Sequence, residues 1–354
     1  MNKTKLITTL LLSFTLCACS SNGASESSNK VNEPVKEEIH YYAPLSGIET
    51  EKNISKEPVF AVMIDNHPDA TPQSGLNDAE IIYEFKAEGE YTRFMALFMK
   101  NHVDVLGPVR SARPYFVDTA KEYDAIYAHW GGSDAGYMEI ETVGLKDLDG
   151  IYLEGSTYYR NKEVKKKRPH DGYTSYDLLY SAAKDFNYLE DLKEVKGFKF
   201  DTSENLDTLN LQMGDSPATK LSLDFFKHYN MTFEYNEETK TYLPIRNGEN
   251  VIDERDGSNV SAKNIILEFA KSSITGPKDT LTIEHIGSGN GKLFTQGKVI
   301  DITWEKPSKK EKTIFKTTNG EEIILAPGLT FIEVLDPTDN VLIEPVIQTQ
   351  ESAS

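Results

Sequence analysis

The sequence predicts an α/β N-terminal domain, in which helices flank a mixed sheet, followed by a mainly antiparallel β domain. Two patterns support this fold class. Between residues 58 and 188, short apolar runs alternate with segments of helical spacing, as in layered α/β structures. Beyond residue 222 the segments are short, rich in β-branched and aromatic residues, and separated by Gly, Asn and Asp turns.

A chain of 354 residues is long enough for about two domains, and its 18 Tyr and 16 Phe supply ample core material. Composition and pattern together divide the chain into six parts. These are a signal peptide (1–18), a lipidated tether (19–57), an α/β domain (58–200), a connector (201–222), a mainly β domain (223–345) and a tail (346–354).

The first residues have the form of an export signal. Lys3 and Lys5 precede an apolar run over Leu6–Leu16, which is too short to span a membrane. The run ends in Leu16-Cys17-Ala18-Cys19, which resembles a bacterial lipobox, whose cysteine receives a diacylglycerol. We therefore expect lipidation of Cys19 and anchoring on the outer, extracytoplasmic face of the cell membrane. An ordinary signal peptide or a buried hydrophobic helix is the alternative.

Charge and cysteine content exclude several classes of protein. With 38 Lys and Arg against 56 Asp and Glu, the net charge of −18 would repel nucleic acid. Two cysteines are too few for a disulfide scaffold, a Cys-rich zinc module or an iron–sulfur protein.

The α/β domain begins with a buried strand over Pro58–Ile64, which delivers Asp65-Asn66-His67 to a loop. Further expected strands are Ala79–Phe85, Tyr91–Met99 and Ala125–Trp130, with a short extended stretch at Val103–Val109. Expected helices are Arg113–Tyr123, Asp134–Gly144 and Tyr173–Phe186, the second capped by Ser133 or Asp134 and the third by Thr174 or Ser175.

The second domain contains a succession of short strand-like segments. They are Asp224–Pro244, Asn264–Phe269, Thr280–His285, Lys298–Trp304, Thr313–Lys316, Ile323–Leu325 and Thr330–Leu335. Gly287–Lys292 lacks the spacing of a phosphate-binding loop, and we expect a hairpin turn there.

The segment Gly107–Pro114 carries the strongest binding signal. Arg110 and Arg113 lie between an extended stretch and a helix, so their guanidinium groups and the free N–H groups of the helix could hold a phosphate or carboxylate. The alternative is that these arginines pair with local acids such as Asp65 or Asp118.

Two further segments supply candidate residues. At the end of the first strand, Asp65 could hold a divalent cation such as Mg²⁺, and Asn66 or His67 could orient a ligand; a simple Asx turn is the alternative. The basic run at residues 160–170 offers Arg168 and His170 to anionic lipids, polymers or a diphosphate, unless it is only a solvated loop.

Several strings resemble the YerB family of Gram-positive lipoproteins. They are Ile64–Pro68, Pro72–Leu76, Thr92-Arg93-Phe94, Gly107–Arg113, His170, Tyr173–Asp177, Ser288–Lys292, Gly297-Lys298 and Pro327-Gly328. The resemblance implies the domain layout and the compartment. The family has no established biochemical activity, so the chemistry stays open.

Two functions are compatible with these residues. The first is an envelope module that binds or assembles an anionic ligand, an anionic polymer or a partner protein, which the lack of a complete catalytic motif favours. The second rests on a distant similarity to the LytR–CpsA–Psr phosphotransferases, which act on lipid-linked diphosphate glycopolymers. That similarity implies diphosphate binding by Arg110, Arg113 and Arg168 and metal binding by Asp65. The oligomeric state is open.

Overall fold

The first predicted strand lies in the middle of the fold. In the computed structural model, which describes residues 39–276 and 280–345, it is β3 (Phe60–Asp65), and all six of its residues are buried. It pairs antiparallel with β5 (Tyr91–Phe98) and parallel with β6 (Ile126–His129). Both faces of the strand are covered, which is why its sequence is continuously apolar.

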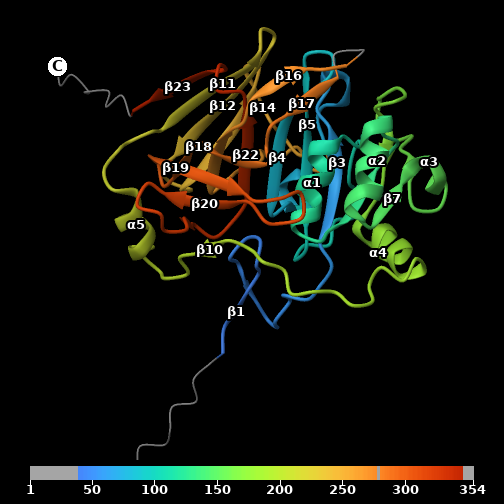
Figure 1. Ribbon diagram of the computed structural model, residues 1–354, viewed down its shortest axis with the longest axis horizontal. Coiled ribbons are helices and arrows are strands. Elements are labelled where there is room, and N and C mark those ends of the chain that lie inside the picture. Colours follow the sequence, from blue (N-terminus) through green and yellow to red (C-terminus); the bar gives the residue numbers. More distant parts are fainter. Residues whose placement is uncertain (1–38, 277–279, 346–354) are drawn as a thin grey trace, which may run out of the picture. The chain divides into compact units, whose positions relative to one another are not determined.

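One large mixed sheet contains strands from both halves of the chain (Figure 1). Its ten strands, in spatial order, are β20 (Ile314–Thr317), β19 (Lys298–Lys306), β18 (Gly287–Thr295), β15 (Asn264–Phe269), β22 (Thr330–Leu335), β4 (Ile81–Ala87), β5, β3, β6 and β7 (Asp147–Asp149). The two halves meet where β22 pairs in parallel with β4.

Helices gather around the β3–β6–β7 end of this sheet, as Figure 1 shows. They are α1 (Pro114–Glu122), α2 (Asp134–Val143), α3 (Gly150–Leu153) and α4 (Tyr176–Asp185). The helix α5 (Asp207–Met213) follows later in the chain, and two 3₁₀ turns, η1 (Pro68–Ala70) and η2 (Leu76–Asp78), lie between β3 and β4 in the sequence. Ser133 caps α2 and Ser175 caps α4, each accepting a hydrogen bond from a first-turn N–H.

A second, antiparallel sheet is formed by the C-terminal half. Its order is β14 (Glu249–Asn250), β13 (Thr241–Arg246), β12 (Tyr229–Asn236), β11 (Lys220–Phe226) and β23 (Asn340–Glu344). Leu221, Met231 and Phe233 of this sheet pack with α4 on one face of the large sheet. The helices α1, α2 and α5 cover the opposite face.

Four two-stranded ladders complete the described strands. They are β1 (Tyr41–Tyr42) with β2 (Glu49–Thr50), β8 (Tyr159–Arg160) with β9 (Gly172–Tyr173), β10 (Lys199–Phe200) with β21 (Ile324–Leu325), and β16 (Ser272–Ile274) with β17 (Leu281–Ile283). The first of these involves residues that the sequence assigns to the tether. Ala43 and Leu45 have no exposed surface, so residues 40–57 fold with the rest of the unit that begins at His40.

The predicted fold class is confirmed, since a mixed sheet with helices is followed by mostly antiparallel strands. The turn predicted at Gly287–Lys292 is wrong, because these residues belong to β18 and pair with β19. Gly289 faces the Trp304 indole and Gly291 faces the Leu267 carbonyl oxygen, and neither position has room for a Cβ atom. These glycines therefore reflect close packing rather than a turn.

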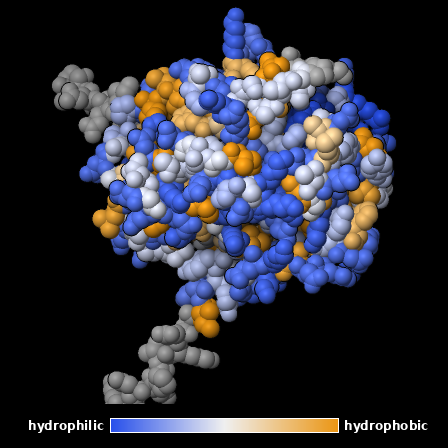
Figure 2. Space-filling view, in the orientation of Figure 1, coloured by the Kyte–Doolittle hydropathy of each residue, from blue (hydrophilic) through white to orange (hydrophobic). Residues whose placement is uncertain are grey.

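The surface and the helices give two further facts. Figure 2 shows that hydrophilic residues cover most of the face in view, with apolar residues in small groups. Among the described residues, no helix has the length and apolar character that a membrane crossing requires.

Candidate functional site

Polar side chains collect at one edge of the large sheet. The strands β3, β4, β6 and β7 run in the same direction, so their carboxyl ends meet at this edge. Asp65-Asn66-His67 follows β3, and Glu88 lies in the turn between β4 and β5. Open sheets place ligands at such an edge, as the sequence predicts for Asp65.

The arginine-bearing segment lies beside the end of β3. Its backbone forms hydrogen bonds to this strand on one side, from Asp65 N–H to the Pro108 carbonyl and from Arg110 N–H to the Met63 carbonyl. On the other side, Trp130 N–H after β6 donates to the Arg110 carbonyl. Residues 108–110 thus fill the space where β3 and β6 no longer pair, and they fix Arg110 next to Asp65.

Asp65 is the centre of this arrangement. Its side chain is 3% exposed, and Oδ2 lies 2.7 Å from His170 Nδ1 and 3.0 Å from Arg110 Nε. Oδ1 accepts a hydrogen bond from the His67 N–H. Both oxygens of this predicted metal ligand are therefore engaged by nitrogen groups, and a cation could reach them only by displacing these contacts.

The guanidinium group of Arg110 faces an acidic partner on one side only. Its Nε faces the Asp65 carboxylate as an ion pair but is not aimed along a hydrogen bond, and no other described residue accepts a hydrogen bond from the guanidinium group. The side chain is 23% exposed. Charged guanidinium groups usually bind two acceptors at once, so Arg110 retains capacity for an acceptor from solution.

Aromatic rings lie next to this pair. The His67 ring stacks on His170 with centroids 4.7 Å apart and contacts Tyr91 at 4.4 Å. Burial lowers the pKa of His67, and the nearby His170 lowers it further, although Asp65 and Asp69 act in the opposite direction. His67 is therefore mostly neutral at pH 7.

Arg113 belongs to a neighbouring group. Its Nε pairs with Glu88, and Arg93 Nη2 lies 3.3 Å from the other oxygen of this carboxylate. Burial alone would raise the pKa of Glu88, but Arg113 and Arg93 bring it below its usual value. Burial and the Arg113 charge lower the pKa of Arg93. Arg113 thus pairs with a local acid, which is the alternative to ligand binding, but the acid is Glu88 rather than Asp65 or Asp118.

Asn66 has a structural role in the fold. Its side chain is fully buried, and Nδ2 donates to Glu84 Oε1, Thr92 Oγ1 and the Tyr229 hydroxyl. Its Oδ1 accepts from Gln73 and Arg246. All of its hydrogen-bonding capacity is used inside the protein, and none points to a ligand.

Arg168 lies apart from the Asp65 group. Its side chain is 71% exposed, and its one ion-pair partner within the described chain is Glu154, 3.4 Å away. In the same basic run, Lys166 turns inward to Glu254 at 2.7 Å and to the Tyr173 hydroxyl at 3.0 Å. The structure therefore brings together Asp65, His67, Arg110 and His170, and it separates Arg113 and Arg168 from them.

Sequence reasoning misses Asp69, Tyr91 and Arg93 as neighbours of the site. Asp69 follows His67 by two residues, and Arg93 lies in the Thr92-Arg93-Phe94 string, so both occur near recognised positions. Arg93 becomes a neighbour through the β3–β5 pairing, in which it is the direct partner of Asp65. Asp69 and Tyr91 become neighbours through their contacts with the His67 ring.

The structure is that of an α/β protein whose mixed sheet carries Asp65, His67, Arg110 and His170 at its carboxyl edge. Two family models match the chain, described as "Protein of unknown function (DUF3048) N-terminal domain" over residues 45–189 and "Protein of unknown function (DUF3048) C-terminal domain" over residues 221–332. The chain belongs to this family. The models leave residues 190–220 between them, around the predicted connector.

One relative and its solved structure support the same assignment. The "Putative lipoprotein YerB" of Bacillus subtilis is 33% identical over 304 residues, which cover 84% of this chain and 87% of that protein. The crystal structure of YerB from Bacillus subtilis matches with a TM-score of 0.75 and 29% identity, covering 85% of this chain and 99% of the solved chain. The predicted YerB-like family is thus confirmed. Cys19, where we expect the lipid, lies outside the described residues.

Proposed function

We propose that this protein is a membrane-anchored, extracytoplasmic module that binds a phosphate-bearing ligand at the carboxyl edge of β3. The observation that carries the proposal is the state of Arg110. Its guanidinium group is partly exposed, faces one carboxylate, and forms no hydrogen bond to any described residue. A bidentate phosphate would complete its hydrogen bonding.

The local charge supports an anionic ligand. Arg93 and Arg113 both pair with Glu88 in the neighbouring group, so Arg110 is the guanidinium group at this edge that faces a single carboxylate, in a chain with a net charge of −18. An anion would therefore be attracted to Arg110 rather than to the paired arginines beside it. Asp65 would hold Arg110 in place rather than contact the ligand.

The lipobox-like sequence supports the membrane location. Lipidation of Cys19 would keep the site near the membrane surface, and the similar Bacillus subtilis protein is named a lipoprotein. Two acyl chains give stable anchoring. Lipid-linked phosphates and anionic wall polymers are the ligand classes within reach, and an envelope partner protein could bind the second sheet.

A phosphotransferase of the LytR–CpsA–Psr type is the second candidate. The hydrogen-bonding pair Asp65–His170 favours it, because a histidine oriented by a carboxylate can accept a proton from an attacking hydroxyl. It has less support than binding alone, since Arg113 and Arg168 pair with Glu88 and Glu154 instead of converging on Arg110.

The test measures binding of inorganic pyrophosphate and of a detergent-solubilised polyprenyl diphosphate by calorimetry and thermal unfolding. We expect binding, with stabilisation of about 2.7 kcal/mol at a hundredfold excess over Kd. Arg110→Gln should weaken affinity at least about tenfold, as loss of a charged bidentate contact predicts. The matched change Arg168→Gln should have little effect.

Controls separate binding from folding and from catalysis. Circular dichroism verifies that Arg110→Gln folds, and Arg110→Lys provides a second variant that keeps the charge. Equal affinities for the wild-type protein and both Arg110 variants would overturn the proposal. If the diphosphate is cleaved in the presence of a sugar polymer, and His170→Gln abolishes cleavage, the transferase candidate replaces simple binding.

A further inference from the structure

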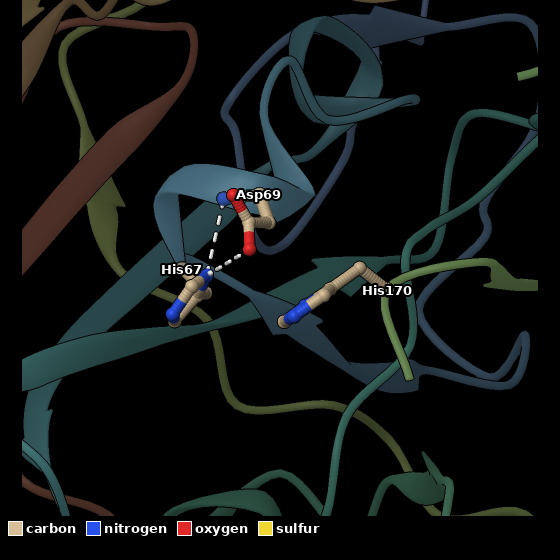
Figure 3. A group of neighbouring side chains, drawn as sticks. All are labelled: His67, Asp69 and His170. Carbon is tan, nitrogen blue, oxygen red and sulfur yellow. Dashed lines mark hydrogen bonds and ion pairs between the residues drawn. The ribbon is translucent and has the colours of Figure 1, made fainter. Parts of the chain in front are cut away.

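Three potential metal ligands lie together beside the proposed anion site. His67, Asp69 and His170 each offer a ligand atom, and these atoms all lie within 4.8 Å of one another. Figure 3 shows His67 and Asp69 on the turn that follows β3, with His170 reaching toward them from a separate segment of the chain. His67 and His170 are 103 positions apart in the sequence, so only the fold brings them together.

The surrounding contacts determine which imidazole nitrogens can hold a metal ion. His170 Nδ1 lies 2.7 Å from Asp65 Oδ2, so Nδ1 carries the proton and Nε2 presents its lone pair. His67 Nδ1 accepts a hydrogen bond from the Asp69 N–H at 3.1 Å, so its lone pair is engaged in this cap and a metal ion on Nδ1 must displace the N–H. Asp69 Oδ2 lies 3.8 Å from His67 Nδ1.

We propose that His67, Asp69 and His170 bind a divalent transition metal of the Zn²⁺ or Co²⁺ class. Two imidazole nitrogens and one carboxylate oxygen form the donor set of three-ligand zinc sites, which keep a fourth position open. Imidazole ligands favour Zn²⁺ and related ions over Mg²⁺, which prefers oxygen ligands and keeps its water. This proposal differs from the expectation of Mg²⁺ at Asp65, because it involves a softer ion and the neighbouring residues.

Asp65 has a second role in this arrangement. A carboxylate that accepts the Nδ1 proton of a metal-binding histidine fixes its tautomer, orients the ring and strengthens its ligand nitrogen. Asp65 therefore supports the metal from the outer shell, and the same oxygen holds Arg110 at 3.0 Å.

Binding requires a local rearrangement of these side chains. The Asp69 side chain is 77% exposed and free to turn toward the imidazoles. The two rings are stacked with 21° between their planes, so one of them must rotate about its Cβ–Cγ bond for both lone pairs to face the ion. The metal proposal goes beyond the anion proposal, because metal binding needs no anion.

The experiment titrates Zn²⁺, Co²⁺ and Mg²⁺ into the full-length chain with Cys17 and Cys19 replaced by serine, which removes both thiols. Calorimetry gives stoichiometry, and the visible absorption of bound Co²⁺ reports the geometry. We expect one Zn²⁺ or Co²⁺ per chain, a tetrahedral Co²⁺ spectrum and much weaker binding of Mg²⁺.

Variants assign the ligands. His67→Gln and His170→Gln should each lower Zn²⁺ affinity at least about tenfold, and Asp65→Asn should lower it about 10- to 100-fold through the outer shell. His228→Gln, at an exposed histidine, is the matched control and should bind normally. Arg110→Gln should retain the metal while losing the anion, which separates failure of one proposal from failure of the other.

Two results would overturn the metal site. One is the absence of a Co²⁺ spectrum in the wild-type protein at millimolar metal. The other is equal Zn²⁺ affinity in the wild-type protein, His67→Gln and His170→Gln, which would mean binding elsewhere on the surface.

Discussion

At the residue scale, Asp65 determines how the basic groups at the sheet edge are arranged. Its two oxygens contact the His67 backbone, the His170 ring and Arg110, and burial gives these contacts weight because water competes little for them. One carboxylate at the end of a strand thus orients an imidazole and a guanidinium group from two distant segments.

Asn66 supports the adjacent buried network. Replacing Asn66 with Ala should lower the free energy of unfolding by about 3 kcal/mol or more, because Glu84, Gln73 and Arg246 lose a partner that they contact in the interior. Urea unfolding measures the change. Asn259→Ala, at an exposed position, should change stability by less than about 0.5 kcal/mol. Similar values for the two variants would contradict the buried role.

Glu268 on β15 should make stability depend on pH. Burial and the Glu122 charge raise its pKa from 4.5 to about 8, although Lys306 acts in the opposite direction. Between these two values the native state holds a proton that the unfolded state has released. This carboxyl group therefore reduces stability as pH rises through that window, by at most about 1.4 kcal/mol per pH unit.

The variant Glu268→Gln copies the protonated acid and should remove this dependence. We expect its stability relative to the wild-type protein to increase between about pH 5 and about pH 8, in urea titrations at several pH values. Glu249→Gln, on an exposed edge strand, is the control for the substitution itself. A difference for Glu268→Gln that stays constant over this range would contradict the raised pKa of Glu268.

At the element scale, β18 shows why a glycine-rich string need not be a turn. A Cβ atom on Gly291 would lie 2.4 Å from the Leu267 carbonyl oxygen of the paired strand. Gly291→Ala should therefore force the two strands apart and cost about 1–3 kcal/mol of stability. Thermal unfolding tests this. Ser288→Ala, at an exposed position of the same strand, is the control, and equal midpoints would contradict the packing argument.

The segment around Arg110 shows, at the same scale, what could not be predicted from the sequence. Its extended character was visible in the sequence, and so was the helix that follows it. Its insertion between β3 and β6 was not, because the hydrogen bonds that hold it come from residues 63 and 130, remote in the chain. The local propensity of a segment does not indicate where two other strands cease to pair with each other.

At the scale of the whole molecule, the shared sheet should make the two halves unfold together. β22 pairs with β4 over five residues, and separating the halves would expose two long strand edges. We therefore expect a single unfolding transition for the unit that begins at His40.

The two tryptophans provide the measurement, since Trp130 lies in the N-terminal half and buried Trp304 in β19. In each single-tryptophan variant, Trp130→Phe and Trp304→Phe, fluorescence and far-ultraviolet circular dichroism should give the same urea midpoint. A fluorescence transition that precedes the circular dichroism change in either variant would indicate that the halves unfold separately.

The sequence by itself determined the fold class, the family and many of the elements, because apolar periodicity, helix caps and short motifs are local properties of the chain. It also singled out Asp65, His67, Arg110 and His170. Only the tertiary structure decided which of the candidates meet. It joined both halves in one sheet, enclosed Asn66, paired Arg113 with Glu88 and placed Asp69 beside the histidines. These outcomes depend on contacts between residues far apart in the chain, and the same arginine can satisfy its charge with whichever carboxylate the fold brings near.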